Sequence, residues 1–249
     1  MFRVLAVLLV LPSAGVAQSE VVVSAASSLA EVLEDLARRH ERAAGDRVVL
    51  NLAASNTLAR QIDAGAPVDL FVSANEAQIA SIARWLVPGT RVEMVSNALA
   101  IAVPADRARR FESIGDLMGP DIRRIAIGDP DAVPVGVYAR RHLQAAGLWD
   151  GLAAKIVPAG SARLALAAVE AGAVDAAIVY RTDLASTTGA VEAYGVPVGD
   201  GPRIVYVGAL VRDGPNTAGA ARFLEFLRGA EAAAAFASAG FVPLDEVRR

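Results

Sequence analysis

The sequence predicts an α/β protein with mostly parallel sheets flanked by helices, divided into two lobes with a ligand cleft between them. Three observations lead to this fold class. Short runs rich in β-branched residues alternate with segments of helical periodicity along the chain of 249 residues, as in proteins built from strand–helix–strand units. Typical helix-start residues recur directly after these runs. Two long extended runs, 97–104 and 204–211, enclose the central third, which indicates that the chain leaves one lobe and later returns to it.

The first seventeen residues have the pattern of a secretory signal peptide. A charged start at Arg3 is followed by an apolar run over residues 4–11 and then by small residues up to Ala17. This is the order found in cleaved signals, and the apolar run is too short to span a bilayer. Because the chain has no cysteine, no lipid can be attached to one at the new N-terminus. We therefore expect residues 1–17 to be removed and the mature protein to be soluble outside the inner membrane.

From residue 21 onward, predicted strands and helices alternate. Short apolar runs predict strands at 21–24, 48–52, 69–73, 124–127 and 176–180. The first helix is the clearest, because Ser28 stands three residues before Glu31, which is the spacing of a capping box. Apolar residues then recur on one helical face from Leu29 to Leu36 until Gly45 provides a typical stop.

Three further helix starts follow the same arrangement. One helix is predicted to begin at Ser55, one around Gly136 with a stop at Gly147, and one at Ser161. Free backbone N–H groups and a partial positive charge are found at the N-terminus of a helix. Several such ends directed at one cleft can bind an anion without any basic side chain.

The two extended runs set the expected limits of the lobes. We assign residues 18–102 and 208–249 to the first lobe and residues 103–207 to the second lobe. The last helices, at 217–228 and 231–239, complete the first lobe in this assignment. In an α/β protein of this kind, a ligand binds in the cleft between the lobes.

The sequence contains few residues of the types that catalyse reactions or bind metals, so we predict no catalytic residue and no metal site. It has two histidines, His40 and His142, which stand beside arginines late in predicted helices and are expected on the solvated surface. Asp129 and Asp131 flank a proline, a pattern that more often stabilises a turn than forms a metal or acid–base pair. Arg163 follows a helix start and could either reach an anion or lie on an exposed flank. The competing hypothesis is an enzyme on the same scaffold that uses one of these aspartates or Arg163.

Charge and hydropathy argue against two classes of partner. The net charge is −3, from 24 basic and 27 acidic residues, and no long block of one sign occurs. Bulk charge therefore attracts neither nucleic acid nor an anionic membrane. Beyond the N-terminal segment, the sequence also has no unbroken apolar run of the roughly 18 residues that a membrane-spanning helix needs.

Six short strings stand in a fixed order along the chain. They are AASSL at 25–29, ASNTLARQI at 54–62, GAPVDLFVSA at 65–74, GDP at 128–130, VPVGVYA at 133–139 and IVY at 178–180. In this order and spacing they closely resemble the bacterial periplasmic molybdate-binding proteins, and the likeness extends from about Val21 to Pro243. The resemblance implies a two-lobed periplasmic binding protein fold of type II, capture of molybdate or tungstate in the cleft, and delivery to the membrane permease and ATPase of an ABC transporter. It also implies a periplasmic monomer without enzymatic activity and without a cofactor.

The same resemblance implies which residues hold the oxyanion. Ser28 and Ser55 match the serines that open the first and second helices, and Tyr180 matches the ligand-binding tyrosine. Val135 and Ala162 match positions that contribute a backbone amide. Ser27 is adjacent to Ser28, so the sequence leaves open which of the two hydroxyls faces the ligand.

Selection among oxyanions must come from size and protonation, because molybdate, tungstate and sulfate are all tetrahedral dianions. Cavity radius can separate molybdate from sulfate but not from tungstate. Phosphate carries a proton that needs an acceptor, and a pocket made only of donors leaves that proton unpaired. Tungstate, sulfate and phosphate remain alternative cargoes, and an adaptor protein without a small ligand is a further alternative.

Overall fold

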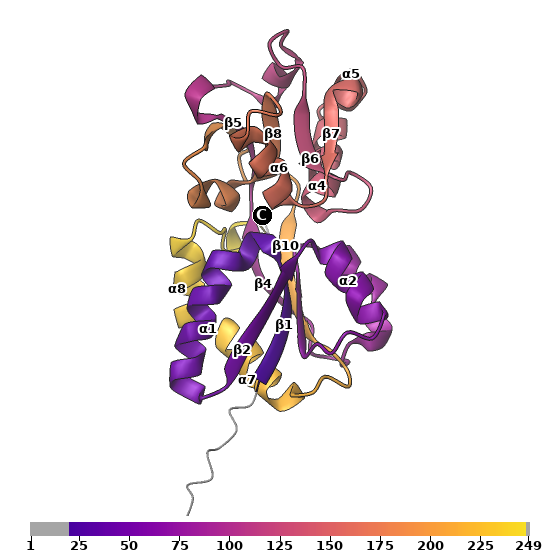
Figure 1. Cartoon of the computed structure of the whole chain (residues 1–249), viewed down its shortest axis with the longest axis vertical. Coiled ribbons are helices and arrows are strands. Elements are labelled where there is room, and N and C mark those ends of the chain that lie inside the picture. The colour runs from indigo at the N-terminus through magenta and orange to yellow at the C-terminus, as the bar shows by residue number, and fades with distance from the viewer. Residues whose placement is uncertain (1–19, 248–249) are drawn as a thin grey trace, which may run out of the picture.

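The computed structural model describes residues 20–247, and within this range the chain forms two lobes that each contain a five-stranded sheet (Figure 1). The predicted signal peptide, residues 1–17, lies outside the described residues. None of the helices between residues 20 and 247 has the length and apolar character needed to cross a membrane.

The sheet of the first lobe has the strand order β2-β1-β3-β10-β4. Its strands are β1 (Glu20–Ala26), β2 (Arg47–Ala53), β3 (Leu70–Ser73), β4 (Val92–Asn97) and β10 (Ile204–Leu210). β1 is parallel to β2 and β3, while β10 is antiparallel to β3 and β4. The helices of this lobe are α1 (Ala30–Ala44), α2 (Ser55–Asp63), α3 (Glu76–Ser81), α7 (Thr217–Leu227) and α8 (Ala230–Ser238). α1, α7 and α8 pack together on one side of the sheet, and α2 and α3 lie on the other side (Figure 1).

The sheet of the second lobe repeats this plan with the order β7-β6-β8-β5-β9. Its strands are β5 (Leu99–Pro104), β6 (Ile125–Gly128), β7 (Ile156–Ala159), β8 (Ala176–Tyr180) and β9 (Ala190–Gly195). Its helices are α4 (Pro134–Ala145), α5 (Trp149–Leu152) and α6 (Ala162–Glu170). β6 is parallel to β7 and β8, and β5 is antiparallel to β8 and β9. In each described sheet, four of the five strands thus point the same way, which confirms the predicted fold class.

Short 3-10 turns complete the chain. They are η1 (Ser27–Leu29), η2 (Ala83–Trp85), η3 (Ala105–Arg107), η4 (Ile114–Met118), η5 (Ala153–Lys155), η6 (Arg181–Ser186) and η7 (Leu244–Glu246). Two of them lie next to the region between the lobes. η1 connects β1 to α1, and η6 follows Tyr180 at the end of β8.

Strand pairing places the two crossings between the lobes earlier in the chain than expected. The expected boundaries, after residues 102 and 207, would cut β5 and β10 in two. β5 pairs from Leu99 onward with β8 and β9 of the second lobe, and β10 pairs along its length with β3 and β4 of the first lobe. The extended run 97–104 is therefore not one strand, because Ala98 separates β4 from β5. The crossings lie at Ala98 and in the segment 196–203, so that residues 99–195 form the second lobe.

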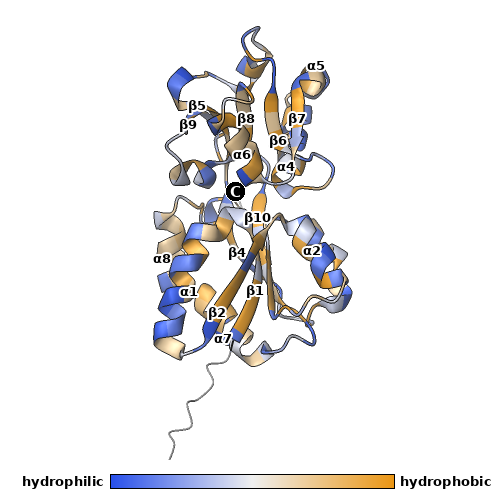
Figure 2. Ribbon diagram, in the orientation of Figure 1, coloured by the Kyte–Doolittle hydropathy of each residue, from blue (hydrophilic) through white to orange (hydrophobic). Residues whose placement is uncertain are grey.

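Both lobes are stabilised mainly by apolar burial of their sheets, whose strands are hydrophobic while the outer helix faces are hydrophilic (Figure 2). One expectation for α1 was wrong. His40 is 3% exposed, and its ring lies 5.1 Å from that of Phe223 and 5.4 Å from that of Phe226. The reason is that α7 covers the face of α1 that carries Leu33, Leu36 and His40, so that the histidine belongs to the apolar face.

Candidate functional site

A small cavity lies between the lobes, where the carboxyl ends of parallel strands meet. The first lobe lines it with Ala26, Ser27, Ser28, Ala54, Ser55 and Ala74, and the second lobe lines it with Val133, Pro134, Val135, Ala162 and Tyr180. The structure thus brings together all five residues that the resemblance implied. Ser27 lines the cavity as well as Ser28, but Ser28 is the more buried of the two.

The cavity has the dimensions of a small ion. Its volume is about 20 Å³, which is close to the space that one ordered water molecule or a small ion occupies. A tetrahedral ion with four oxygens around one central atom suits a space of this size better than an amino acid or a sugar does. Small side chains make the space, since alanines occupy the strand ends and helix starts on both sides.

Residues at helix starts line the cavity. Ser55 is the first residue of α2, and Val135 lies in the first turn of α4 behind Pro134. First-turn amides have no acceptor within their own helix, and neither of these helices has a side-chain cap. At α6, Ser161 caps the amide of Leu164 at 3.1 Å, which leaves the amide of Ala162 without a cap. The helix starts therefore supply hydrogen-bond donors and partial positive charge to the cavity.

Neither Ser28 nor Ser55 caps a helix through its side chain. Ser28 lies inside η1, and no side chain caps the start of this turn or of α1, so the predicted capping box with Glu31 was wrong. Instead, Ser28 Oγ lies 2.8 Å from Tyr206 Oη. Ser55 Oγ accepts a hydrogen bond from the amide of Ala74 at 3.0 Å, between α2 and the end of β3. Each hydroxyl is thus fixed by a contact within the first lobe.

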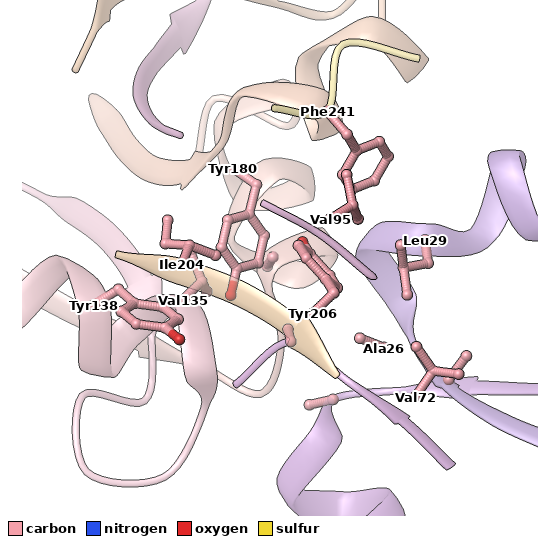
Figure 3. Packing of buried hydrophobic residues seen from close by; sticks show 14 of the residues in the cluster. Ala26, Leu29, Val72, Val95, Val135, Tyr138, Tyr180, Ile204, Tyr206 and Phe241 are labelled. Atoms are coloured by element: carbon pink, nitrogen blue, oxygen red, sulfur yellow. The ribbon is translucent and has the colours of Figure 1, made fainter. Parts of the chain in front are cut away.

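Tyr180 brings the third hydroxyl, from the end of β8. Its side chain is 2% exposed, and among the described residues its Oη has no hydrogen-bond partner. The Tyr180 ring lies 6.0 Å from that of Tyr206, and Figure 3 shows the two side chains near each other. Burial raises the pKa of Tyr180 well above its ordinary value, and the nearby Tyr206, Tyr138 and Asp183 add to this shift. Because its hydroxyl stays protonated, Tyr180 has a proton to donate to an acceptor in the cavity.

The charged residues considered for catalysis do not line the cavity. Asp129 Oδ1 accepts from the amide of Asp131 at 2.9 Å, which is the expected turn contact. Arg163 forms an ion pair with Glu31 of the first lobe and donates to Ser186 Oγ at 2.8 Å. Within residues 20–247, no three side chains of His, Cys, Asp or Glu gather into a possible metal site. The cavity lining of uncharged donors is therefore suited to holding an anion.

A buried carboxyl group lies behind the cavity. Asp183 in η6 is fully buried, and its Oδ2 accepts from the amide of Tyr180 at 3.1 Å. Its Oδ1 lies 3.6 Å from Arg163 Nε. Burial raises the pKa of Asp183 to about 7, although Arg163 and the Tyr180 amide act in the opposite direction.

This carboxyl group should make the stability depend on pH. In the unfolded chain Asp183 ionises near its ordinary pKa of about 3.9, so between this value and the folded pKa of about 7 the folded state binds more protons. The contribution is fully present below about pH 4 and is lost as the pH rises through about 7. We expect the free energy of unfolding of the wild type to fall by about 4 kcal/mol relative to Asp183→Asn across this range. Urea denaturation at a series of pH values measures the difference, and parallel pH profiles would contradict it.

Sequence reasoning missed two residues beside the site, Tyr206 and Asn97. Tyr206 is 0% exposed in the middle of β10 and contacts Ser28. Asn97 ends β4 and donates to Tyr206 Oη at 3.2 Å. The available signal was a single hydroxyl in an otherwise apolar strand, since a buried tyrosine hydroxyl usually has a hydrogen-bond partner.

Two α/β lobes that enclose a small cavity lined by donors define the class of two-lobed solute-binding proteins. The chain belongs to the family of bacterial extracellular solute-binding proteins, whose family model matches residues 21–242. It is 35% identical to the molybdate-binding protein ModA of Escherichia coli over 90% of this chain and 89% of that protein. It is 31% identical to ModA of Haemophilus influenzae over 90% of this chain and 91% of that protein.

A solved structure shows the same fold. The periplasmic molybdate-binding protein of Azotobacter vinelandii superposes with a TM-score of 0.79 at 26% identity, covering 89% of this chain and 98% of that one. The resemblance to bacterial periplasmic molybdate-binding proteins that the sequence motifs indicated is therefore confirmed.

Proposed function

We propose that the protein binds molybdate between its lobes in the periplasm and delivers it to the permease and ATPase of an ABC transporter. The observation that carries this proposal is the cavity itself, which is small and has a lining without charged side chains. The similarity to molybdate-binding proteins over most of the chain supports the same ligand. In this proposal the protein is a carrier and not an enzyme, it needs no cofactor, and it works as a monomer.

The proposed ligand contacts are three hydroxyls and the backbone amides of helix starts. Ser28, Ser55 and Tyr180 donate through their hydroxyls, and Val135 and Ala162 donate through their amides. A hydrogen bond to a charged acceptor contributes about 1.5–3 kcal/mol net. Several such bonds offset the cost of burying the dianion and closing the lobes. We therefore expect micromolar affinity or tighter, which corresponds to about −8 kcal/mol or lower.

Selectivity follows from the same lining. Tungstate has the size and charge of molybdate and is expected to bind equally well. Sulfate is smaller and makes longer contacts in a cavity whose radius both lobes fix. Hydrogen phosphate presents a proton to a lining whose side chains include no carboxylate, so this proton has no strong acceptor.

Calorimetric titration with molybdate tests the proposal, using the wild type and Tyr180→Phe. The wild type should bind one molybdate per chain, and the variant should bind about 10- to 100-fold more weakly because one donor to a charged acceptor is lost. Tyr194→Phe is the matched control, because Tyr194 lies on β9 and does not line the cavity. The proposal fails if the wild type shows no heat of binding, and the assigned role of Tyr180 fails if both variants bind like the wild type.

A further inference from the structure

A chain of side-chain hydrogen bonds runs from the cavity to the second lobe. Ser28 Oγ and Tyr206 Oη lie 2.8 Å apart, and Asn97 Nδ2 lies 3.2 Å from Tyr206 Oη. Asn97 Nδ2 also donates to Thr182 Oγ1 of η6 at 2.8 Å. All four side chains are buried. The chain of contacts thus begins at a cavity residue, passes through β10 and the end of β4, and ends beside Tyr180 in the second lobe.

The donors and acceptors in this network have one consistent arrangement. The backbone amide of Ala98 donates to Asn97 Oδ1 at 2.8 Å, which fixes the oxygen on that side of the amide group. The Nδ2 group therefore donates both to Thr182 and to Tyr206. A tyrosine hydroxyl has one proton, and Ser28 Oγ is the remaining partner of Tyr206 Oη. Tyr206 must therefore donate to Ser28, because its proton would otherwise be buried without an acceptor.

This arrangement determines what Ser28 can offer to a ligand. Ser28 Oγ accepts from Tyr206, so its own proton is left for the cavity that it lines. Ser55 also keeps its own proton for the cavity, because its Oγ accepts from the amide of Ala74. Tyr180 Oη has no protein partner among the described residues. All three hydroxyls can thus point a proton at the anion.

We infer that Tyr206 and Asn97 are positioning residues that hold Ser28 as a hydrogen-bond donor, and thereby make the cavity favour fully deprotonated oxyanions over singly protonated ones. This inference rests on the proposed function, because it concerns the same cavity. Neither residue lines the cavity, so both act through Ser28. Without the Tyr206 proton, Ser28 is free to rotate and accept a proton from the ligand.

A double-mutant cycle on molybdate affinity tests the inference with Tyr206→Phe, Ser28→Ala and the combined variant. Phenylalanine keeps the ring contacts with Phe241 and Tyr180 and removes only the hydroxyl. We expect Tyr206→Phe to weaken molybdate binding about tenfold in the wild type, but by less than about twofold when Ser28 is already alanine. A purely structural role would give the same factor in both backgrounds, and that result would overturn the inference.

The ratio of molybdate to phosphate affinity gives a second readout that loss of packing does not move. Tyr206→Phe should lower this ratio at least about fivefold at a pH where hydrogen phosphate predominates, because a freed Ser28 can accept its proton. Asn97→Asp is a variant of the same shape that places an acceptor beside Tyr206 and draws its proton away from Ser28. Its added charge repels both dianions alike and does not itself change the ratio, whereas the release of Ser28 should again lower the ratio.

The outcomes separate this inference from the proposed function. An unchanged ratio in both variants would refute the positioning role while wild-type molybdate binding still stands. Absence of molybdate binding in the wild type would instead refute the proposed function. Tyr194→Phe serves as the control in every titration and should leave both affinities unchanged.

Discussion

Molybdate affinity is expected to fall about 100-fold or more when Ser55 is replaced by alanine. The variant loses a donor to the anion, which is worth about 1.5–3 kcal/mol. It also leaves the Ala74 amide, whose hydrogen bond to Ser55 Oγ is 3.0 Å long, buried without an acceptor at the edge of the cavity. Both effects act on the first lobe's half of the site, so calorimetric titration should show a large loss of affinity with little loss of helix content.

The matched control is Ser81→Ala. Ser81 ends α3 on the surface, where its hydroxyl donates to the carbonyl of Gln78 at 2.9 Å. It lies outside the cavity lining, so its replacement should leave molybdate affinity unchanged. If Ser55→Ala bound molybdate within about threefold of the wild type, a difference below 1 kcal/mol, Ser55 would not be a ligand residue.

Replacing Gly136 by alanine is expected to lower the stability of the protein strongly, because the added methyl group has no space. A Cβ atom at this position would lie 1.9 Å from the carbonyl oxygen of Gly128 and 2.6 Å from that of Asp129. These are backbone atoms at the end of β6, so α4 would have to move away from the sheet. Overpacking of this kind costs about 3 kcal/mol, which corresponds to a fall in Tm of roughly 6–12 °C for a protein of this size.

Such a shift would also displace the amide of Val135 from the cavity, so molybdate binding should weaken together with stability. Thermal unfolding measures the first effect and titration below the Tm measures the second. Gly199→Ala is the control, because a Cβ atom there would meet open space. Equal Tm values for the two variants would show that α4 does not contact β6 as closely as described.

The sequence was sufficient to predict where the helices begin and which residues gather around the cavity. Strand ends, small residues and helix starts are local patterns, and parallel strands bring their carboxyl ends to the same edge of a sheet. The four helix starts therefore met as expected, and Ser28, Ser55 and Tyr180 lie in one lining. Recognition of the family motifs, rather than periodicity, singled out the five site residues, including Val135 and Ala162, whose side chains carry no chemistry of their own.

Contacts between segments far apart in the chain could not be predicted in this way. Ser28 looked like an N-cap, because the spacing to Glu31 is local, but its partner Tyr206 lies 178 residues away. His40 looked exposed because the covering helix α7 comes from the other end of the chain. The crossing at Ala98 was hidden because β4 ends at Asn97 and β5 begins at Leu99, so that the strands of the two lobes follow each other with a single residue between them.

The proposed function and the arrangement of the hydroxyl groups predict the same kind of ligand. Both predict a tetrahedral oxyanion without a proton. Burial raises the pKa of Tyr206 as well as that of Tyr180, so both hydroxyls keep their protons at neutral pH. The donors of the cavity therefore do not titrate. Any pH dependence of binding should come from the anion itself and from Asp183 behind the site.

Thermal unfolding of the protein with molybdate, tungstate, sulfate and phosphate in parallel tests the central claim most directly. A ligand present at about one hundred times its dissociation constant adds roughly 2.7 kcal/mol to the free energy of unfolding. For a protein of this size we expect molybdate and tungstate each to raise the Tm by roughly 5–10 °C, with little change in sulfate or phosphate. An equal rise with sulfate would contradict selection by cavity size, and no rise with any of the four anions would contradict the assignment of the cavity as an oxyanion site.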